Sequence, residues 1–480
     1  MNFRMIYYLI GNILRLEAAF MLPALAISFA HHEKASFWAF FGSVVFLLAI
    51  SLPARKPQKT AFYAQEGFLV VGLAWIVISL LGSLPFYLSG AIPGLANCIF
   101  EGISGFSTTG ASILQDIESL PMGILYWRSF SHWLGGVGVL IFVLAILPMA
   151  KGSGHSMHLL RAEGPGPRAH KILPRMHESA KKIYGIYIFF TLLLMVLLLV
   201  GGMPVFDAVT TAFSTAGTGG FHIKNDSMIS YSPFLQGTVT FFMALFGVNF
   251  YVLHLILLRQ FSKAFANEEF RVYLLVLLSA TMIISANVLY HQGGNLLNTL
   301  HHVAFQVASV ITGTGFATLD YNYWPELSKW ILVVLMMLGA SAGSTCCGIK
   351  ISRAVIFSKA AGCGISKMLR PRLVRLVRMD GEVVDDQVVN GVFTFLTYYA
   401  LITILSVVLV SLDNFSFETT VTAVLACFNN VGPGLGMVGP VGNYHAFSDF
   451  SKLVLSADML IGRLEIFPML MLFMPSAWKR

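Results

Sequence analysis

Long apolar runs joined by short loops constrain the fold of this chain more than any other feature. Charged residues make up only 11% of its 480 residues, which is less than half of the roughly 25% typical of soluble domains. A membrane-spanning helix needs about 20 predominantly apolar residues. Runs of sufficient length occupy residues 5–29, 36–54, 67–89, 127–150, 183–201, 234–258, 272–290, 328–350, 389–411 and 450–474. The sequence therefore predicts an all-α integral membrane protein and excludes a soluble enzyme, a disordered chain and a nucleic-acid-binding protein.

The basic residues gather in loops that fall on one side of this arrangement of spans. Residues 151–182 and 350–378 are rich in Lys and Arg, and two smaller clusters follow the second and sixth runs, with Arg55, Lys56 and Lys59 in one and Arg259, Lys263 and Arg271 in the other. Because Lys and Arg accumulate in cytoplasmic loops, this side is predicted to be cytoplasmic. An even number of spans then places both termini in the cytoplasm. The net charge of +8 follows from this topology and indicates no nucleic-acid partner.

Four shorter apolar segments lie on the opposite side, and each ends in a turn that contains glycine. They occupy residues 99–112, 205–221, 300–316 and 417–434. Their cores read FSTTG, FSTAG, ITGTG and FNNVG, so that a bulky apolar residue precedes a glycine by four places: Phe106 and Gly110, Phe213 and Gly217, Ile311 and Gly315, Phe428 and Gly432. The recurrence predicts four pseudo-symmetric repeats of span, pore loop and span around one pore. The expected units are two extra spans in 1–60 and the repeats 61–160, 161–262, 263–380 and 381–480.

The turns that end these segments suit a cation filter. A half-helix that stops inside the membrane directs a partly negative C-terminal end at the centre, and four turns around one axis can form a ring of carbonyl oxygens that replaces an ion's hydration shell. Glycine permits the positive φ that such a ring requires. The predicted filter residues are Thr108, Thr109, Gly110, Thr215, Ala216, Gly217, Gly313, Thr314, Gly315, Asn430, Val431 and Gly432. We interpret the acids Glu101, Asp207 and Glu418 as charges at the starts of three half-helices, where an anion suits the helix dipole.

These four turns, with the two extra N-terminal spans, resemble the Trk/Ktr/HKT superfamily of potassium transporters, and the bacterial TrkH-type pore subunit most of all. Further similarity lies in WRSFSHWLGGVGVL (127–140), RAEGPGP (161–167), GASAGSTCCGIK (339–350) and IGRLEIFP (461–468). The resemblance implies potassium uptake across the inner membrane of a bacterium. It also implies a potassium preference, because the related plant sodium carriers have serine at the position of Gly110.

The resemblance also implies partners for the chain. It predicts a homodimer with one pore in each subunit, and a cytoplasmic ring of TrkA-type subunits that bind the regulatory nucleotide. The chain itself contains no Walker A sequence, so the only small ligand we expect it to bind is the transported K⁺.

A stretch of small residues interrupts the span predicted at 328–350. Residues 339–348 include Gly339, Gly343 and Gly348, and each glycine weakens a helix by about 1 kcal/mol relative to alanine. The resemblance implies a gating loop below the filter, although Cys346 and Cys347 stand where glycines are expected. Close helix packing through small residues is the alternative interpretation.

Arg463 stands in the middle of the last predicted span. Because a charge at mid-bilayer is unfavourable, such a residue usually faces a cavity, and the resemblance implies a position in the pore below the filter. A structural pairing of Arg463 with a buried partner is the alternative. Lys350 is interpreted as the first cytoplasmic lysine after the loop, with a pore-facing position as the alternative.

Other functions remain as alternatives. Within transport, the pore could be permeable to sodium or coupled to another ion. Residues 339–343 match the GxSxG pattern of hydrolases, which makes a membrane-embedded hydrolase using Ser341 an alternative from a different class. That pattern requires a strand, a turn and a helix, which a membrane span does not supply, so we expect no enzyme activity.

Overall fold

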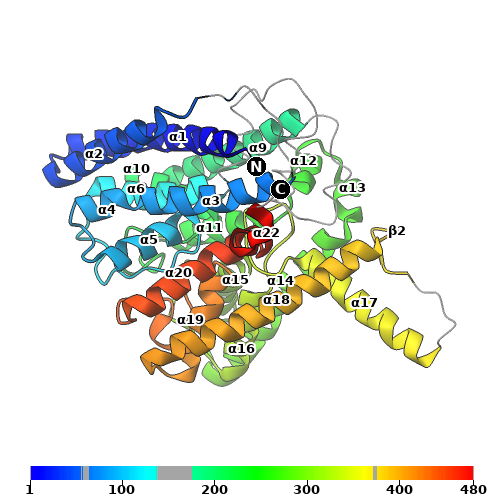
Figure 1. Cartoon of the computed structure of the whole chain (residues 1–480). Coiled ribbons are helices and arrows are strands. Elements are labelled where there is room, and N and C mark those ends of the chain that lie inside the picture. The colour runs from blue at the N-terminus through cyan, green and yellow to red at the C-terminus, as the bar shows by residue number, and fades with distance from the viewer. Residues whose placement is uncertain are drawn as a thin grey trace.

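The chain folds into a bundle of helices (Figure 1). The computed structural model describes residues 2–55, 57, 64–136, 138, 176–370 and 376–478. Its helices are α1 (Phe3–Ala30), α2 (Lys34–Ser51), α3 (Ala64–Gly82), α4 (Leu84–Leu88), α5 (Leu95–Phe106), α6 (Met122–Gly136), α9 (Met176–Val200), α10 (Val205–Gly217), α11 (Pro233–Phe246), α12 (Phe250–Leu257), α13 (Phe261–Ala266), α14 (Glu268–Gln292), α15 (Leu296–Thr312), α16 (Glu326–Met337), α17 (Ile351–Leu369), α18 (Asp386–Val410), α19 (Phe417–Phe428), α20 (Asp449–Arg463), α21 (Phe467–Phe473) and α22 (Pro475–Trp478). Three short 3₁₀ helices cover Tyr321–Tyr323, Ser411–Asp413 and Gly436–Val438, and the strands β1 (Arg378–Met379) and β2 (Glu382–Val383) pair antiparallel.

Several helices have the length and composition of membrane spans. Among the described residues, six pass by length and hydropathy, and the bent pair of α11 and α12 makes a seventh. Polar side chains cap some of them: those of Asn267 and Asp385 accept hydrogen bonds from the first turns of α14 and α18. On α18, Leu401, Ile404, Leu405 and Val408 are 58–62% exposed at helical spacing. An apolar stripe of this kind is unfavourable in water and marks a contact with the membrane or with another membrane protein, and the all-α membrane fold is confirmed.

Three of the predicted spans are interrupted. The span at 234–258 bends by 109° between α11 and α12. In the span at 328–350, α16 ends at Met337, and residues 338–350 are not helical. The span at 450–474 breaks between α20 and α21. Non-helical backbone at membrane depth needs hydrogen-bond partners from the protein, and the first two breaks supply them to each other: Phe250 N–H donates to the Gly343 carbonyl, and Ser341 N–H donates to that of Gly247.

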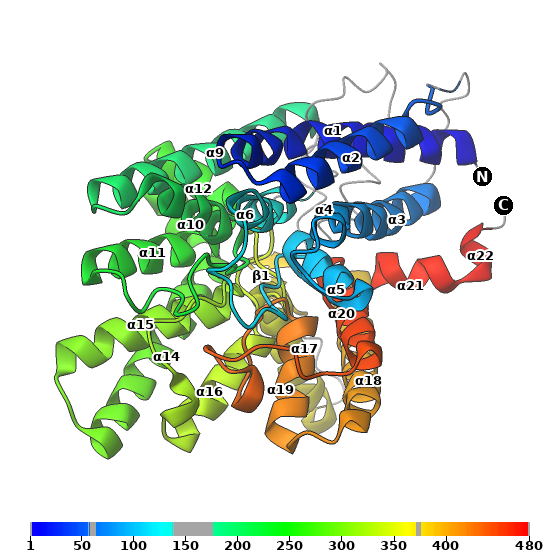
Figure 2. The same cartoon turned by 90° about the vertical axis from the view of Figure 1, so that its left-hand side faces the viewer.

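Some of the predicted features lie outside the described residues. They are most of the span 127–150 beyond Gly136, residues 151–175 of the large basic loop with its RAEGPGP stretch, and Lys56, Lys59, Arg372 and Arg375. The two marked ends of the chain lie close together in both views (Figures 1 and 2), and α13 and α17 project from the bundle in Figure 1.

Each half-helix packs against helices that flank it in sequence. α5 contacts α3 and α6, α10 contacts α9 and α11, α15 contacts α14 and α16, and α19 contacts α18 and α20. The four half-helices surround a common centre in the view of Figure 2. This packing is what an order of span, pore loop and span leads us to expect, and the repeat boundaries stay a prediction. The packing also determines where the chain leaves each half-helix, and the candidate site begins there.

Candidate functional site

The four half-helices end in turns with the same backbone pattern. Positive φ angles occur at Thr108, Thr218, Gly313 and Asn430, and again two residues later at Gly110, Gly220, Gly315 and Gly432. The residue between them donates its N–H to the carbonyl five residues earlier: Thr109 to Ser104, Gly219 to Ser214, Thr314 to Ser309 and Val431 to Ala426, over 2.8–3.0 Å. These shared bonds align residues 108–110, 218–220, 313–315 and 430–432, which we call the four turns.

In the second repeat the structural alignment lies three residues beyond the alignment made from the sequence. Thr215, Ala216 and Gly217 form the last turn of α10, which ends at Gly217. The Thr215 hydroxyl donates to the Thr211 carbonyl within that helix, over 2.7 Å. Thr218, Gly219 and Gly220 therefore occupy the turn instead. The residues predicted in the other three turns stand at the aligned positions, whereas Thr218, Gly219 and Gly220 were not predicted.

The four turns touch one another in a closed ring. A Cβ atom added to the last glycine of each turn would overlap a carbonyl oxygen of the next turn: Gly110 meets Gly219, Gly220 meets Thr314, Gly315 meets Val431, and Gly432 meets Thr109. The loosest of these approaches, at Gly432, would still be 2.6 Å. Only glycine combines this close approach with a positive φ. The backbone of all four repeats is thus brought together at one place inside the bundle.

Side chains brace this ring from behind. The Thr109 hydroxyl lies 2.7 Å from that of Ser107 and accepts a hydrogen bond from the Asn430 amide over 2.7 Å. The same amide donates to the Met459 carbonyl on α20 over 2.9 Å. In the third turn, the Thr314 hydroxyl lies 2.8 Å from that of Thr312. These bonds hold the polar side chains of the turns in place beside the backbone carbonyls, which are groups that can coordinate a cation.

Acidic side chains lie on the exposed loops that follow the first two turns. Asn225 accepts a hydrogen bond from the Ile117 N–H over 2.7 Å and donates to an Asp116 carboxylate oxygen over 2.9 Å. The hydrogen bond from Asn225 lowers the pKa of Asp116 below its ordinary value. Glu118 accepts from the Asn225 N–H over 3.1 Å. With its pKa lowered, Asp116 stays charged at neutral pH and favours the approach of cations to this end of the bundle.

Residues 338–350, which we call the intramembrane loop, fold back on themselves between α16 and α17. The Gly339 N–H donates to the Ile349 carbonyl, and the Ile349 N–H donates to that of Met337, both over 3.0 Å. A Cβ on Gly339 would overlap the Cys347 carbonyl, and Gly343 and Gly348 have positive φ angles of 72° and 79°. The predicted interruption of the span is therefore confirmed, and helix packing through small residues is not what this stretch does.

Arg463, the last residue of α20, joins the intramembrane loop to the first turn. Its guanidinium donates to the Thr108 hydroxyl over 3.2 Å, to the Thr345 carbonyl over 2.9 Å and to the Cys347 sulfur over 3.0 Å. It also donates to the carbonyls of Gly135 and Gly136 at the described end of α6. No carboxylate among the described residues forms an ion pair with it. The structure thus brings together the two features predicted to gate the pore.

A cavity of about 140 Å³ lies beside this contact. Gly343, Cys346 and Cys347 of the intramembrane loop line it, together with Arg463 and Lys350. Lys350 is buried and donates to the Cys346 carbonyl. Lys350 therefore lines this cavity, while its interpretation as the first cytoplasmic lysine and the pore-facing alternative both stay predictions.

Glu269, which was not predicted as a site residue, also contacts the intramembrane loop. It is buried at the start of α14, and one carboxylate oxygen accepts from Ala342 N–H over 2.7 Å and from Ser352 N–H over 3.2 Å. It therefore holds the loop and the first turn of α17 together. Acidic residues are common at helix starts. The sequence around Glu269 therefore does not distinguish a residue that binds the loop from a simple helix-start charge.

The three acids assigned to half-helix starts have different environments. Asp207 and Glu418 lie in the first turns of α10 and α19, as expected. Glu101 instead lies in the middle of α5, fully buried, and forms an ion pair with Arg128 of α6. The interpretation of Glu101 as a plain helix-start charge is wrong, because its carboxylate has a buried cationic partner.

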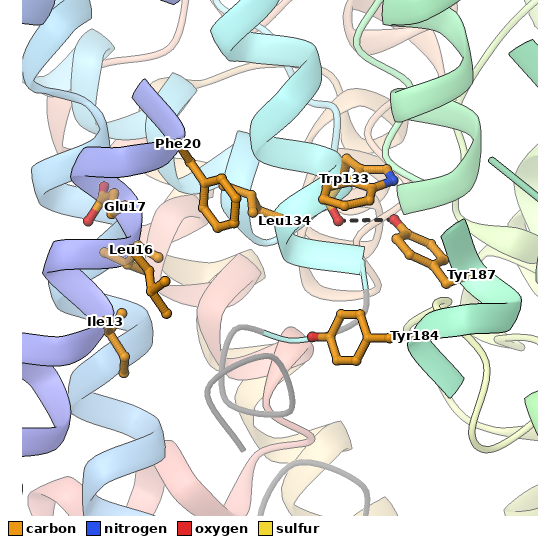
Figure 3. A pocket seen from close by; sticks show the side chains of 9 residues that line it. Ile13, Leu16, Glu17, Phe20, Trp133, Leu134, Tyr184 and Tyr187 are labelled. Carbon is orange, nitrogen blue, oxygen red and sulfur yellow. Dashed lines mark hydrogen bonds between the residues drawn. The ribbon is translucent and has the colours of Figure 1, made fainter. Parts of the chain in front are cut away.

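A second, much smaller cavity separates the extra helix α1 from α6 and α9 (Figure 3). Its volume is about 20 Å³, which is room for about one water molecule. Apolar side chains line most of it, and the Tyr187 hydroxyl beside it donates to the Trp133 carbonyl over 3.0 Å (Figure 3). A hydrated ion cannot fit there, so the ion pathway is expected at the four turns and not beside α1.

Comparison with known proteins agrees with this geometry. A family model described as a cation transport protein, TrkH, matches residues 35–479. The Trk system potassium uptake protein TrkH of Salmonella typhimurium is 33% identical over 493 residues, which cover 100% of both chains. TrkG of Escherichia coli is 29% identical over 483 residues, which cover 99% of each chain.

A solved structure is similar over the same extent. The crystal structure of the potassium transporter TrkH from Vibrio parahaemolyticus superposes with a TM-score of 0.88, at 28% sequence identity and with 100% of both chains covered. The match by a family model over most of the chain and the full-length relatives lead to one conclusion: the chain belongs to the TrkH family of cation transport proteins.

Proposed function

We propose that this protein takes up potassium ions through a filter formed by the four turns. The observation that carries the proposal is the closed ring in which each turn's glycine lies against a carbonyl of the next turn. Four backbone segments that meet in this way can replace the water around a monovalent cation with carbonyl oxygens. The relatives named for potassium uptake support the choice of ion. The filter residues are residues 108–110, 218–220, 313–315 and 430–432.

The intramembrane loop and Arg463 form the gate in this proposal. The loop lies against the first turn through Arg463, which touches Thr108 on one side and Thr345 and Cys347 on the other. A fixed positive charge next to a cation pathway raises the barrier for the ion. Gly339, Gly343, Cys346, Cys347 and Gly348 belong to the loop and would move with it.

The cellular setting is part of the same proposal. The chain resides in the inner membrane of a bacterium, with both termini in the cytoplasm, and works as a homodimer. A cytoplasmic ring of TrkA-type subunits binds the regulatory nucleotide, and this chain binds none. The relatives named as components of a Trk system support such an assembly. Ions enter down the membrane potential, which supplies about 2.3 kcal/mol per 100 mV for each charge.

The alternatives are less well supported. A sodium-permeable or ion-coupled pore would use the same ring, so only transport measurements separate it from potassium uptake. The hydrolase alternative requires a base beside Ser341. Among the described residues, the Ser341 hydroxyl has no hydrogen-bond partner, and the family is one of transporters.

The substitution Gly110→Ser tests the filter. Its Cβ would overlap the Gly219 carbonyl, and Gly110 has a φ of 77°. Fluxes of potassium and sodium into liposomes that contain the purified protein should show a potassium-to-sodium ratio about tenfold lower than that of the wild type. Gly90→Ser is the matched control, because Gly90 has a φ of 69° and no neighbouring atom within 4 Å of an added Cβ. An unchanged ratio in folded Gly110→Ser protein would contradict the proposed filter.

A further inference from the structure

The buried ion pair between Glu101 and Arg128 lies directly behind the first turn. Glu101 comes from α5, which leads into that turn, and Arg128 comes from α6, which follows it. Their side chains are 0% and 1% exposed. Arg128 reaches the same carboxylate oxygen with Nη2 over 2.7 Å and with Nε over 2.8 Å. Removing two charges from water is unfavourable unless both are fully paired. The segments that this ion pair binds indicate what it does.

The carboxylate of Glu101 binds the chain that leaves the first turn. The Ser112 hydroxyl donates to it over 2.9 Å, and the Ile113 N–H donates to its other oxygen over 3.0 Å. Glu101 precedes the turn, while Ser112 and Ile113 follow it. One side chain therefore fastens both ends of residues 108–110 to each other.

The guanidinium of Arg128 extends the contact to the second turn. Its Nη1 donates to the His222 carbonyl over 3.2 Å, and its central carbon lies 4.0 Å from the centre of the Phe221 ring. Phe221 and His222 directly follow Gly220. Its Nη2 also donates to the Ser112 hydroxyl over 3.3 Å. The ion pair thus joins the segments that leave two neighbouring turns of the ring.

The other half-helices carry no charge at the corresponding position. The shared hydrogen bonds of the four turns align Glu101 with Thr211, Gln306 and Ala423. The fourth turn is held by neutral bonds: Tyr444 donates to the Gly432 carbonyl over 2.7 Å, and the Thr422 hydroxyl accepts from the Leu435 N–H over 2.9 Å. The charged brace is therefore a property of the first two turns and not of the shared turn geometry.

From this arrangement we propose that Glu101 and Arg128 are positioning residues that determine ion selectivity, because they fix the spacing between the carbonyls of the first and second turns. This inference rests on the proposed function. Selection between potassium and sodium depends on how well the ring keeps its dimensions and its field of carbonyl dipoles. A brace that joins two turns through these polar contacts and an aromatic face limits how far the turns can close around the smaller ion.

The test measures the potassium-to-sodium flux ratio in liposomes for wild type, Glu101→Gln and the double variant Glu101→Gln/Arg128→Gln. The single variant leaves Arg128 buried without its counter-charge, so both thermal stability and the ratio should fall, the ratio by roughly tenfold. The double variant contains no unpaired charge, so its stability should recover. Its ratio should stay low, because the fork of Arg128 is gone. A merely structural ion pair would instead restore the ratio together with the stability, and that result would overturn the inference.

Two further variants keep the test decisive. Ser112→Ala removes one hydroxyl from the brace and no charge, so it should fold and lower the ratio by about threefold. Glu418→Gln removes a carboxylate from another half-helix without touching a turn, and its ratio should match the wild type. A wild-type protein that does not prefer potassium would refute the proposed function itself. A selective wild type with an unchanged ratio in Ser112→Ala and in the double variant would refute the role of the ion pair alone.

Discussion

The four turns and the intramembrane loop are both non-helical chain inside the bundle, yet they are held in different ways. In the turns, backbone lies against backbone so closely that Gly110 and Gly220 have no room for a Cβ. The loop has backbone contacts too, at Gly339 and with Gly247 and Phe250, but long side chains from other helices, Arg463 and Glu269, also hold it, and it borders a cavity of about 140 Å³.

This difference indicates which region can move. Close-packed backbone shifts only if several segments shift together, because packed interiors deform little. A loop that relies in part on polar side chains and lies next to free volume can shift when those side-chain contacts break. We therefore expect changes in the turns to alter or abolish ion selection, and changes in the loop contacts to alter the rate of flow.

The largest effect is expected from Gly220→Ala in the second turn. The new Cβ would overlap the Thr314 carbonyl, and Gly220 has a φ of 76°. Potassium uptake should fall at least tenfold, an effect of about 1.4 kcal/mol or more, in a growth test at limiting potassium with a strain that lacks its own uptake systems. Gly90→Ala should grow like the wild type. Normal growth with Gly220→Ala would show that the second turn lies elsewhere, as the FSTAG alignment predicts.

Arg463→Ala should have the next largest effect, and in the opposite direction. The substitution removes the charge and the hydrogen bonds that hold Thr345 and Cys347 against the first turn. We expect potassium flux per folded protein to rise about tenfold, which is roughly 1.4 kcal/mol, with little change in the potassium-to-sodium ratio. Loss of flux in well-folded Arg463→Ala protein would refute the gating role and favour a structural one.

Arg463→Lys separates the two contributions of this residue. Lysine keeps the positive charge but cannot reproduce the planar fork of the guanidinium. If the barrier is mainly the charge, flux through this variant should stay near the wild-type value. An increase comparable to that of the alanine variant would mean that the hydrogen bonds to the loop, and not the charge, limit the flow.

Glu269→Gln should loosen the loop more gently. The amide oxygen can still accept from Ala342 and Ser352, but it is a weaker acceptor than the carboxylate. Flux should rise about twofold to threefold, because a neutral hydrogen bond is about half as strong as a charge-assisted one. Glu326→Gln is the control, since Glu326 is an exposed acid at the start of α16 that pairs with Lys329. A reduced flux in Glu269→Gln would indicate that the loop does not obstruct the pore.

The substitution Ser119→Cys should leave transport unchanged. Labelling of the new cysteine tests on which side of the membrane the four turns open. Ser119 is exposed on the loop after the first turn. An impermeant thiol reagent should modify it only from outside the cell, while the native Cys363 on α17 should react only from the cytoplasmic face. Modification of the introduced cysteine from the cytoplasmic side alone would reverse the proposed topology of all four turns.

Much of this architecture could be predicted from the sequence. Runs of apolar residues predict the spans, because a helix that crosses lipid must be apolar. The pattern of a bulky residue and a glycine predicts three of the four turns at the residues where they occur. The small residues at 339–348 predict the intramembrane loop. In each case the physical demand is local: a length, a φ angle or a low helix propensity.

The remaining features depend on contacts between distant residues. FSTAG at 213–217 matches FSTTG at 106–110 more closely in sequence than residues 218–220 do. That match misleads, because Ser214 to Gly217 continue the helix and the turn follows at 218–220. The Gly-Phe pairs at 220–221 and 315–316 are the sequence signal that aligns the second turn with the third. Burial of Glu101 depends on Arg128, which lies 27 residues away, and local sequence does not reveal that pairing.

The closure of the ring between its first and last turns has a consequence for biosynthesis. The Asn430 amide meets the Thr109 hydroxyl across 321 residues of chain. A nascent chain inserts its N-terminal segments first. The first turn therefore lacks its contact with the fourth turn until the last quarter of the protein has been made. Bonds of such long range form slowly. Chains truncated before α19 should therefore be recognised by membrane proteases as incomplete, however many of their spans have already been inserted.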